Sequence, residues 1–186
     1  MDQHAGPAAR IGGGALRPAS IGEMVPLHID TERVDPPLRW TLRAMTRDVH
    51  DRLHRHAGFT AIQDATIGLA DYRSLIARLY GFYAPFEAAA AVVPVRSKWL
   101  VDDLHALGLD RPLPALPKCP HVPRVDSVHF RLGALYVAEG AALGGRDLAR
   151  GLDRLLGQDV AAGRQFFIGR GPETGEAWRG YLALLS

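Results

Sequence analysis

The chain of 186 residues is long enough for one domain with its own core, and its 47% hydrophobic and 23% charged residues are ordinary for a globular protein. The formal net charge of +2 argues against a nucleic-acid partner, and a single cysteine, Cys119, precludes an internal disulfide and fits a reducing cytoplasm. The longest apolar run, Ala88 to Val95, is too short to cross a membrane, and residues 1–25 lack the apolar stretch of a signal peptide.

The first part of the chain predicts a flexible extension followed by a helix. Residues 1–34 are rich in Gly, Ala and Pro, so we expect a single ordered domain over 35–186. A helix is predicted over 38–57, because two prolines precede it and Gly58 follows it. One side of this helix carries an apolar stripe, and the adjacent flank is polar.

The remaining elements are also predicted to be helices, and no alternating strand pattern of useful length occurs, so the predicted fold class is all-α. Pro85 is expected to kink a long helix, and five prolines predict a connector without regular structure over 109–125. Ser97 and Asp126 are the predicted N-caps of two later helices. In chain order the expected segments are a short helix or turn over 60–68, a helix from Asp71 that continues past Pro85 toward Val93, and helices over 97–107, 126–156 and 174–185.

His50 is the first candidate for chemistry. It can be an ordinary surface histidine, the commoner role on a helix flank, or a neutral imidazole that binds a metal. His54 follows at a spacing that can chelate zinc, but the glutamate of the metalloprotease motif is missing, so zinc is not predicted. Arg43 lies about 10 Å before His50 on the same flank, which suits a histidine on a porphyrin iron and an arginine on its carboxylate. The alternative is that Arg39, Arg43 and Arg47 form only a solvated basic face.

A glycine-rich stretch, Tyr136 to Gly145, is the second candidate, because each glycine in a helix costs about 1 kcal/mol relative to alanine. It can be a seam of close helix packing, which also selects small residues. Alanine would satisfy packing alone, so Gly144 and Gly145 predict a bend or a very close backbone approach, in our interpretation by a flat cofactor. Cys119, in the proline-rich connector, is interpreted as incidental.

Four separated stretches carry the recognisable motifs: Leu42 to His50, Tyr72 to Glu87, Tyr136 to Gly145, and Phe166 to Gly171 followed by Trp178. In this order they resemble the haem oxygenase family, particularly the bacterial members that accompany phytochromes. The resemblance covers about residues 38–185.

The resemblance implies a single-domain, all-α haem-oxygenase-like fold with haem between a proximal helix and a kinked, glycine-rich distal helix. His50 would be the axial ligand of the haem iron, and Gly140 and Gly144 would bring the distal backbone close to the haem face, so these three are the implied catalytic residues. Haem b is then both cofactor and substrate, and O2 cleaves it to biliverdin, carbon monoxide and ferrous iron. The other implied haem contacts are Arg43 at a propionate, Thr46, Tyr136, Ala141, Gly145, Phe167 and Arg170.

Three features depart from the family pattern. Ala141 stands where mammalian members have an aspartate that anchors a distal water, so backbone groups or a more distant residue must hold that water, or oxygen activation is weaker. Arg170 stands where tyrosine is common and is expected to add a second propionate contact. The chain ends at Ser186, before a further helical stretch that relatives usually carry, which leaves apolar surface for the extension, for a second subunit or for nothing to cover.

The preferred prediction is a cytoplasmic, bacterial-type haem oxygenase that takes electrons from ferredoxin or a flavoprotein reductase, since no flavin or nicotinamide motif is present. Its biliverdin would supply a phytochrome, or the reaction would serve to release iron. One rival is a haem-binding sensor or carrier on the same fold that does not turn over. Another is a thiaminase-like helical protein, for which Cys119 is a poor nucleophile.

Overall fold

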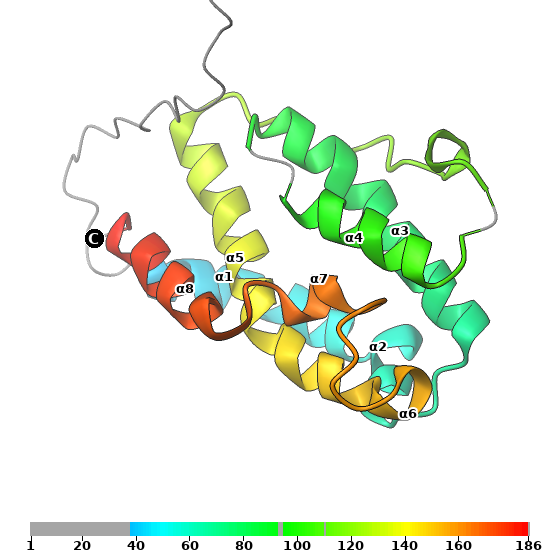
Figure 1. Ribbon diagram of the computed structural model, residues 1–186. Coiled ribbons are helices and arrows are strands. Elements are labelled where there is room, and N and C mark those ends of the chain that lie inside the picture. Colours follow the sequence, from blue (N-terminus) through cyan, green and yellow to red (C-terminus); the bar gives the residue numbers. More distant parts are fainter. Residues whose placement is uncertain (1–37, 93–94, 110, 186) are drawn as a thin grey trace, which may run out of the picture. The chain divides into compact units, whose positions relative to one another are not determined.

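The computed structural model describes residues 38–92, 95–109 and 111–185, and the predicted all-α class is confirmed, because these segments hold helices and loops but no strand (Figure 1). The elements in chain order are α1 (Leu38–His54), α2 (Ala57–Gln63), α3 (Leu69–Ala89), α4 (Val95–Ala106), η1 (Leu113–Ala115), α5 (Val128–Gly151), α6 (Asp153–Leu156), α7 (Gln165–Ile168), η2 (Gly171–Glu173) and α8 (Thr174–Ala183). The predicted extension over 1–34 and the prolines before α1 lie outside the described residues. No helix within the described segments is long and apolar enough to span a bilayer.

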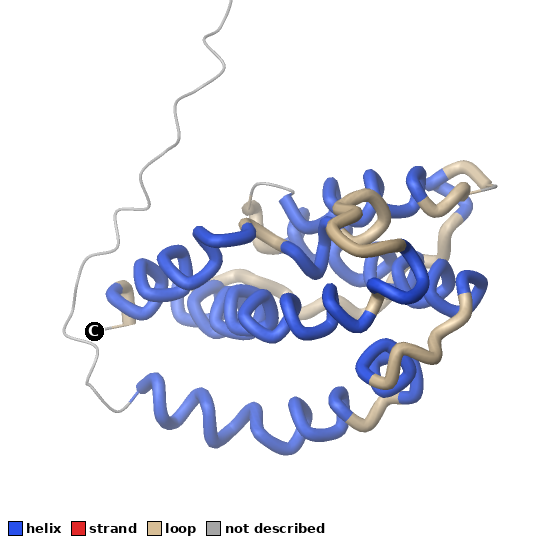
Figure 2. The backbone as a smooth tube through the Cα atoms, turned by 60° about the horizontal axis from the view of Figure 1, so that its bottom comes forward, coloured by secondary structure: helices blue, strands red, loops and turns tan. Residues whose placement is uncertain are grey.

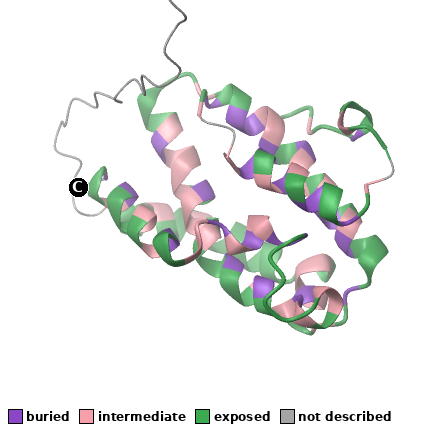
Figure 3. Ribbon diagram, viewed as in Figure 1, coloured by how far each residue is buried: buried purple, intermediate pink, exposed green. Residues whose placement is uncertain are grey.

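The hydrophobic core lies where α3, α4, α5 and α7 meet. α3 packs along α4, α7 packs against both α4 and α5, and α8 packs on α5. Figure 3 shows buried residues on α3, α4 and α5. The largest apolar side chains that are fully buried are Tyr72, Ile62, Ile76, Leu100, Leu104 and Leu152.

The first helix is shorter than predicted. α1 ends at His54 and α2 begins at Ala57, so Gly58 lies inside a helix instead of ending one. The reason is a side-chain cap, since Nδ1 of His56 accepts a hydrogen bond from the amide of Gly58 at 3.2 Å and so starts α2.

Pro85 lies inside α3, which continues through it to Ala89. Proline has no amide hydrogen, so the carbonyl of Gly81, four residues earlier, lacks its usual helical donor. The amide of Cys119 donates to this carbonyl at 2.8 Å. The connector can come this close because a Cβ on Gly81 would collide with the carbonyl oxygen of Pro117. The connector is also more regular than predicted, since it contains a 3-10 turn, η1.

The two predicted N-caps are wrong. Ser97 lies inside α4, and its hydroxyl donates to Glu87 at 2.5 Å. Glu87, buried on α3, accepts the amides of Arg96 and Ser97 at 2.8 and 3.0 Å, so a neighbouring helix supplies the cap. Ser127 caps α5 in place of Asp126, because its hydroxyl oxygen accepts an amide of the first turn.

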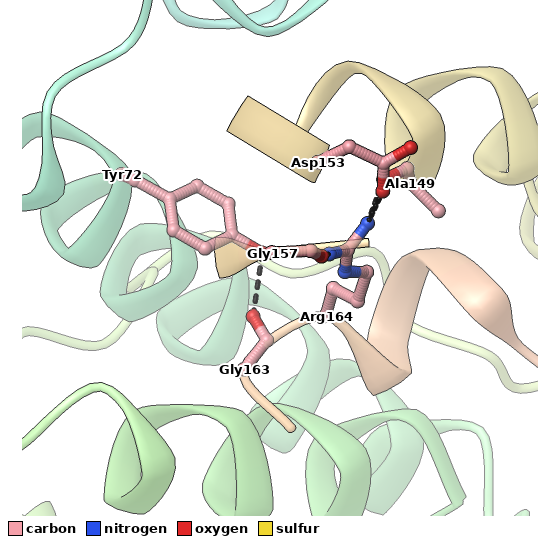
Figure 4. Close-up of polar contacts among 6 residues, drawn as sticks. All are labelled: Tyr72, Ala149, Asp153, Gly157, Gly163 and Arg164. Atoms are coloured by element: carbon pink, nitrogen blue, oxygen red, sulfur yellow. Dashed lines mark hydrogen bonds and ion pairs between the residues drawn. The ribbon is translucent and has the colours of Figure 1, made fainter. Parts of the chain in front are cut away.

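The helix predicted over 126–156 is divided into α5 and α6. Arg164, which is 3% exposed, stabilises the break between them: its guanidinium donates to the carbonyl of Ala149 and to the carboxylate of Asp153, both at 2.5 Å, and to the carbonyl of Gly157 (Figure 4). Gly157, with a φ of 98°, ends α6 as predicted for a helix stop.

The loop after α6 is held to the core by hydrogen bonds with side chains of α3 and α4. The hydroxyl of Tyr72 on α3 donates to the carbonyl of Gly163 at 2.7 Å (Figure 4). Asp103 on α4 accepts the amides of Gln165 and Phe166 at 2.6 and 2.8 Å and so caps α7. Burial raises the pKa of Asp103 to about 6, although the two amide hydrogen bonds act in the opposite direction.

Candidate functional site

Helix α1 is amphipathic, yet all of its 17 residues are exposed or half-buried. Its apolar stripe includes Met45, Val49 and Leu53, whose exposed fractions are 75%, 48% and 53%. In Figure 2, α1 is the helix that follows the grey trace, and its main packing partner is α2. Full burial of each such side chain is worth about 1.5–3 kcal/mol, so this stripe favours an apolar ligand or partner.

His50 projects from the polar flank of α1, with 67% of its side chain exposed. Its Nε2 lies 3.3 Å from Nε2 of His54, and its Nδ1 lies 3.7 Å from a carboxylate oxygen of Asp51. A carboxylate beside Nδ1 favours a proton on that nitrogen, which leaves the lone pair of Nε2 for a metal or a hydrogen bond.

The other two candidates on α1 differ in availability. Arg43 is exposed, and the carbon at the centre of its guanidinium lies 6.0 Å from the ring centroid of Trp40. Its guanidinium can therefore reach a carboxylate outside the helix. Thr46 donates its hydroxyl to the carbonyl of Leu42 at 2.8 Å, so that hydroxyl is engaged within α1.

One face of α5 is exposed and built from small apolar residues. Val137, Ala141 and Gly144 follow at spacings of four and three, which places them on the same side of the helix, and all three are exposed. A Cβ on Gly144 would meet nothing within 4 Å, whereas one on the half-buried Gly140 would touch the indole of Trp178 at 3.6 Å. Such a face lets a flat molecule approach the helix backbone. The ribbon of α5 also changes direction partway along (Figure 1).

Gly145 belongs to a different face of α5. It is buried, and a Cβ on it would collide with the carbonyl oxygen of Phe167. Phe167 is 3% exposed, and its ring stacks 6.4 Å from that of Tyr72. The very close backbone approach that we predicted at Gly145 is therefore made by α7 of the protein itself.

Tyr136 is part of an aromatic cluster between α5 and α8. Its ring centroid lies 5.4 Å from that of Trp178 and 6.5 Å from that of Tyr181. The hydroxyl of Tyr181 donates to the carbonyl of Leu132 at 2.5 Å, which fixes α8 on α5. A Cβ on Gly140 would come within 3.6 Å of the indole of Trp178, so α8 packs beside the glycine-rich segment of α5.

Glu139 is a residue of this region that sequence reasoning missed. Its carboxylate accepts hydrogen bonds from Arg96 of α4 and from Arg170, each at 2.8 Å. Burial alone would raise the pKa of Glu139, but the two guanidiniums outweigh it and lower that pKa below 4.5. Arg170, predicted near a propionate, is one-third exposed and carries this ion pair. The available signal was a lone carboxylate inside an otherwise apolar stretch.

The structure thus collects the predicted residues in two sets. The first lies on α1, and the second lies on α5, on α7 and in the turn that follows α7. The first set is Arg43, Thr46 and His50; the second is Tyr136, Gly140, Ala141, Gly144, Gly145, Phe167 and Arg170.

These helices define an all-α protein that carries an exposed histidine of metal-ligand type on one helix and a small-residue face on another. The family model described as heme oxygenase matches residues 37–186, so the chain belongs to the haem oxygenase family. Searches of the curated proteins and of the solved structures gave no match.

Proposed function

We propose that this protein is an active haem oxygenase, which uses O2 and external electrons to cleave haem to biliverdin, carbon monoxide and ferrous iron. Membership of the family supports the proposal. The observation that carries it is the state of α1, where an exposed imidazole, His50, stands beside an unburied apolar stripe. One helix therefore offers both a ligand for iron and an apolar surface for a porphyrin.

The residues present fit a haem. The carboxylate of Asp51 favours the tautomer of His50 that presents Nε2 to a metal. Arg43 lies two turns earlier on α1 and is exposed, as a partner for a propionate must be. The open space at Gly144, which a larger side chain would fill, leaves the backbone of α5 accessible to a flat ring.

Bound haem supplies the oxygen-binding iron and is itself the molecule that is cleaved. His50 would hold the iron from one side, while Arg43 would fix the rotation of the ring through a propionate. Gly140 and Gly144 would let the backbone of α5 limit the space on the opposite face. Ala141 has no side-chain donor, so backbone groups or water must hold the proton that oxygen activation needs.

The ion pairs of Glu139 have a positioning role in this proposal. They connect α5 to Arg96 on α4 and to Arg170, which follows α7. Glu139 itself directly precedes Gly140. A glycine-rich helix is otherwise easily deformed, since each glycine weakens the helical state. The two ion pairs of Glu139 would thus keep the glycine-rich part of α5 at a fixed distance from the haem ring.

From the resemblance we also propose a cytoplasmic enzyme that receives electrons from ferredoxin or a flavoprotein reductase, with a phytochrome as an acceptor of the biliverdin. The rival function is a haem-binding sensor or carrier that does not turn over. Ala141 is the observation that favours it, because the side chain offers no hydrogen bond to a distal water.

A single experiment separates these functions. Hemin is added to the purified protein, followed by ferredoxin, its reductase, NADPH and catalase, and the visible spectrum is recorded. Loss of the Soret band with growth of a broad red biliverdin band is expected. A stable ferrous-oxy spectrum would instead support the sensor or carrier, and the absence of any Soret shift would contradict both.

His50→Ala tests the ligand assignment in the same assay. We expect it to lose the Soret shift of bound haem, because α1 then offers no imidazole at position 50 to bind the iron. His105→Ala is the matched control, since His105 is an exposed histidine on α4. An unchanged haem spectrum in His50→Ala would show that another residue binds the iron.

A further inference from the structure

His50 and His54 are arranged as a chelating pair. They lie one turn apart on α1, and both side chains are exposed. Their ring centroids are 4.4 Å apart, the ring planes are inclined at 49°, and the two Nε2 atoms approach to 3.3 Å. This contact is a hydrogen bond in the structure, and loss of its proton would leave both Nε2 lone pairs available to one ion beside the helix.

The separation of the two nitrogens matches one edge of a tetrahedral zinc site. Zinc binds imidazole nitrogen at about 2.05 Å, and two such ligands at the tetrahedral angle lie about 3.3 Å apart. A square-planar copper site would bring them to about 2.8 Å. The observed 3.3 Å is therefore compatible with a tetrahedral zinc ion.

The surroundings of His50 also suit zinc. A carboxylate oxygen of Asp51 lies 3.7 Å from Nδ1 of His50. Carboxylates commonly accept a hydrogen bond from this nitrogen in zinc-bound histidines, and a small movement of the exposed Asp51 side chain would bring it within that distance. Among the described residues no cluster of three His, Cys, Asp or Glu side chains exists, so water would complete the coordination.

We propose that haem-free protein binds one Zn²⁺ through Nε2 of His50 and Nε2 of His54. Zinc and haem then compete for His50, a consequence that rests on the proposed function. The missing glutamate, which argued against a metalloprotease site in the sequence, does not bear on a two-histidine chelate, because binding needs only the ligands.

Calorimetric titration of haem-free protein with zinc chloride tests the site directly. One ion per chain is expected, with a dissociation constant on the order of 10 µM, because two ligands supply roughly half the binding free energy of a four-ligand site. His54→Gln should weaken binding at least about tenfold, and His105→Gln on α4 should leave it unchanged. Because His54 is exposed, its replacement removes no buried contact.

Two results would overturn the zinc site. One is equal affinity in wild type and His54→Gln, which would place the ion elsewhere. The other is no binding up to about 1 mM zinc, which would make the short distance between the nitrogens a simple imidazole–imidazole hydrogen bond.

Hemin titration with zinc at about ten times its dissociation constant tests the competition. The apparent affinity for hemin should fall about tenfold in wild type and at most about twofold in His54→Gln, which binds zinc at least about tenfold more weakly. An unchanged hemin affinity in zinc-saturated wild type would overturn the competition. If hemin does not bind at all, the proposed function fails, whereas the calorimetry still decides the zinc site.

Discussion

At the scale of single residues, two adjacent glycines of α5 have opposite environments. Gly144 opens to solvent on the small-residue face, and Gly145 packs against the backbone of Phe167. Neighbouring positions on a helix point about 100° apart, so one glycine can border a ligand while the next forms a packing seam. The functional and the packing interpretations of the glycine stretch are therefore compatible.

Alanine substitutions separate the two environments. Gly145→Ala should lower the free energy of unfolding by about 1–3 kcal/mol, because its Cβ would collide with the carbonyl oxygen of Phe167. Gly144→Ala should raise it by about 0.5–1 kcal/mol, since the site is open and alanine is the better helix former. Urea unfolding of the haem-free variants measures both, and effects of the same sign would contradict the assignment.

Removing the charge of Glu139 should also destabilise the protein. Glu139→Gln leaves the guanidinium of Arg96, which is 9% exposed, without its counter-charge, so we expect a loss of about 2–4 kcal/mol at pH 7 in urea unfolding. The pKa of Glu139 is lowered on folding, so this contribution is present above its ordinary value of 4.5 and is lost as the pH falls.

Asp102→Asn is the matched control for Glu139→Gln. It breaks the ion pair between Asp102 and Lys98, whose side chains are 52% and 73% exposed, respectively. The free energy of unfolding should therefore fall by less than about 0.5 kcal/mol. Comparable losses in the two variants would show that Glu139 contributes no more than a surface charge.

Sequence reasoning at this scale singled out residues whose type and spacing within one helix are informative. It missed residues whose role depends on partners far away in the sequence. His50, Arg43 and the glycines stood out because their type and spacing are informative within one helix. Glu139 did not, since its importance depends on Arg96, 43 positions earlier, and Arg170, 31 positions later. Pairings over such distances follow from the tertiary fold and leave no local pattern.

At the scale of secondary structure, the ends of the helices depend on residues from other elements. Glu87 of α3 caps α4, and Asp103 of α4 caps α7. Local rules therefore predicted the existence of the helices better than their ends: Ser97 and Asp126 were reasonable caps by sequence, yet Glu87 and Ser127 are the observed ones. Gly58 failed as a helix stop because the nearby His56 starts a new helix.

The cap on α7 predicts a pH dependence. Burial raises the pKa of Asp103 from 3.8 to about 6, so the folded state holds the proton of this carboxyl more tightly than the unfolded state does. The stability that the protonated carboxyl contributes is therefore complete below pH 3.8 and is lost as the pH rises through 6. Between pH 5 and pH 7 the wild type should therefore lose about 1 kcal/mol more than Asp103→Asn. Urea unfolding of both proteins at the two pH values measures the difference, and parallel pH profiles would contradict it.

At the scale of the whole molecule, stability is unevenly distributed. The core formed by α3, α4, α5 and α7 holds the fully buried side chains, whereas α1 contributes none of the buried residues in the described chain. Sequence pattern predicted the amphipathic stripe of α1 correctly. It could not predict that the stripe stays exposed, because a hydrophobic pattern marks the surface that favours burial and does not identify its partner.

Hydrogen exchange should detect this difference in the haem-free protein. Amides of α1 are expected to exchange by local opening, at least about 100-fold faster than those around Tyr72 and Ile76 in α3, which are fully buried. Hemin should slow the exchange of α1 and leave that of α3 nearly unchanged. Equal protection of α1 and α3 without hemin would show that α1 is held as firmly as the core.

The hydrogen bond between Cys119 and Gly81 sets limits on how the connector can vary in length. Residues 117–119 are held at one point of α3 by two contacts with Gly81. Cys119 donates to the carbonyl that Pro85 leaves without a helical donor, and the carbonyl oxygen of Pro117 lies against Gly81. Residues added within this segment would separate the two contacts, whereas the exposed positions 120, 121, 123 and 124 are not bound by it. An inserted tag or domain should therefore be tolerated from position 120 onward, 35 positions after the proline whose missing amide hydrogen allows the contact between Cys119 and Gly81.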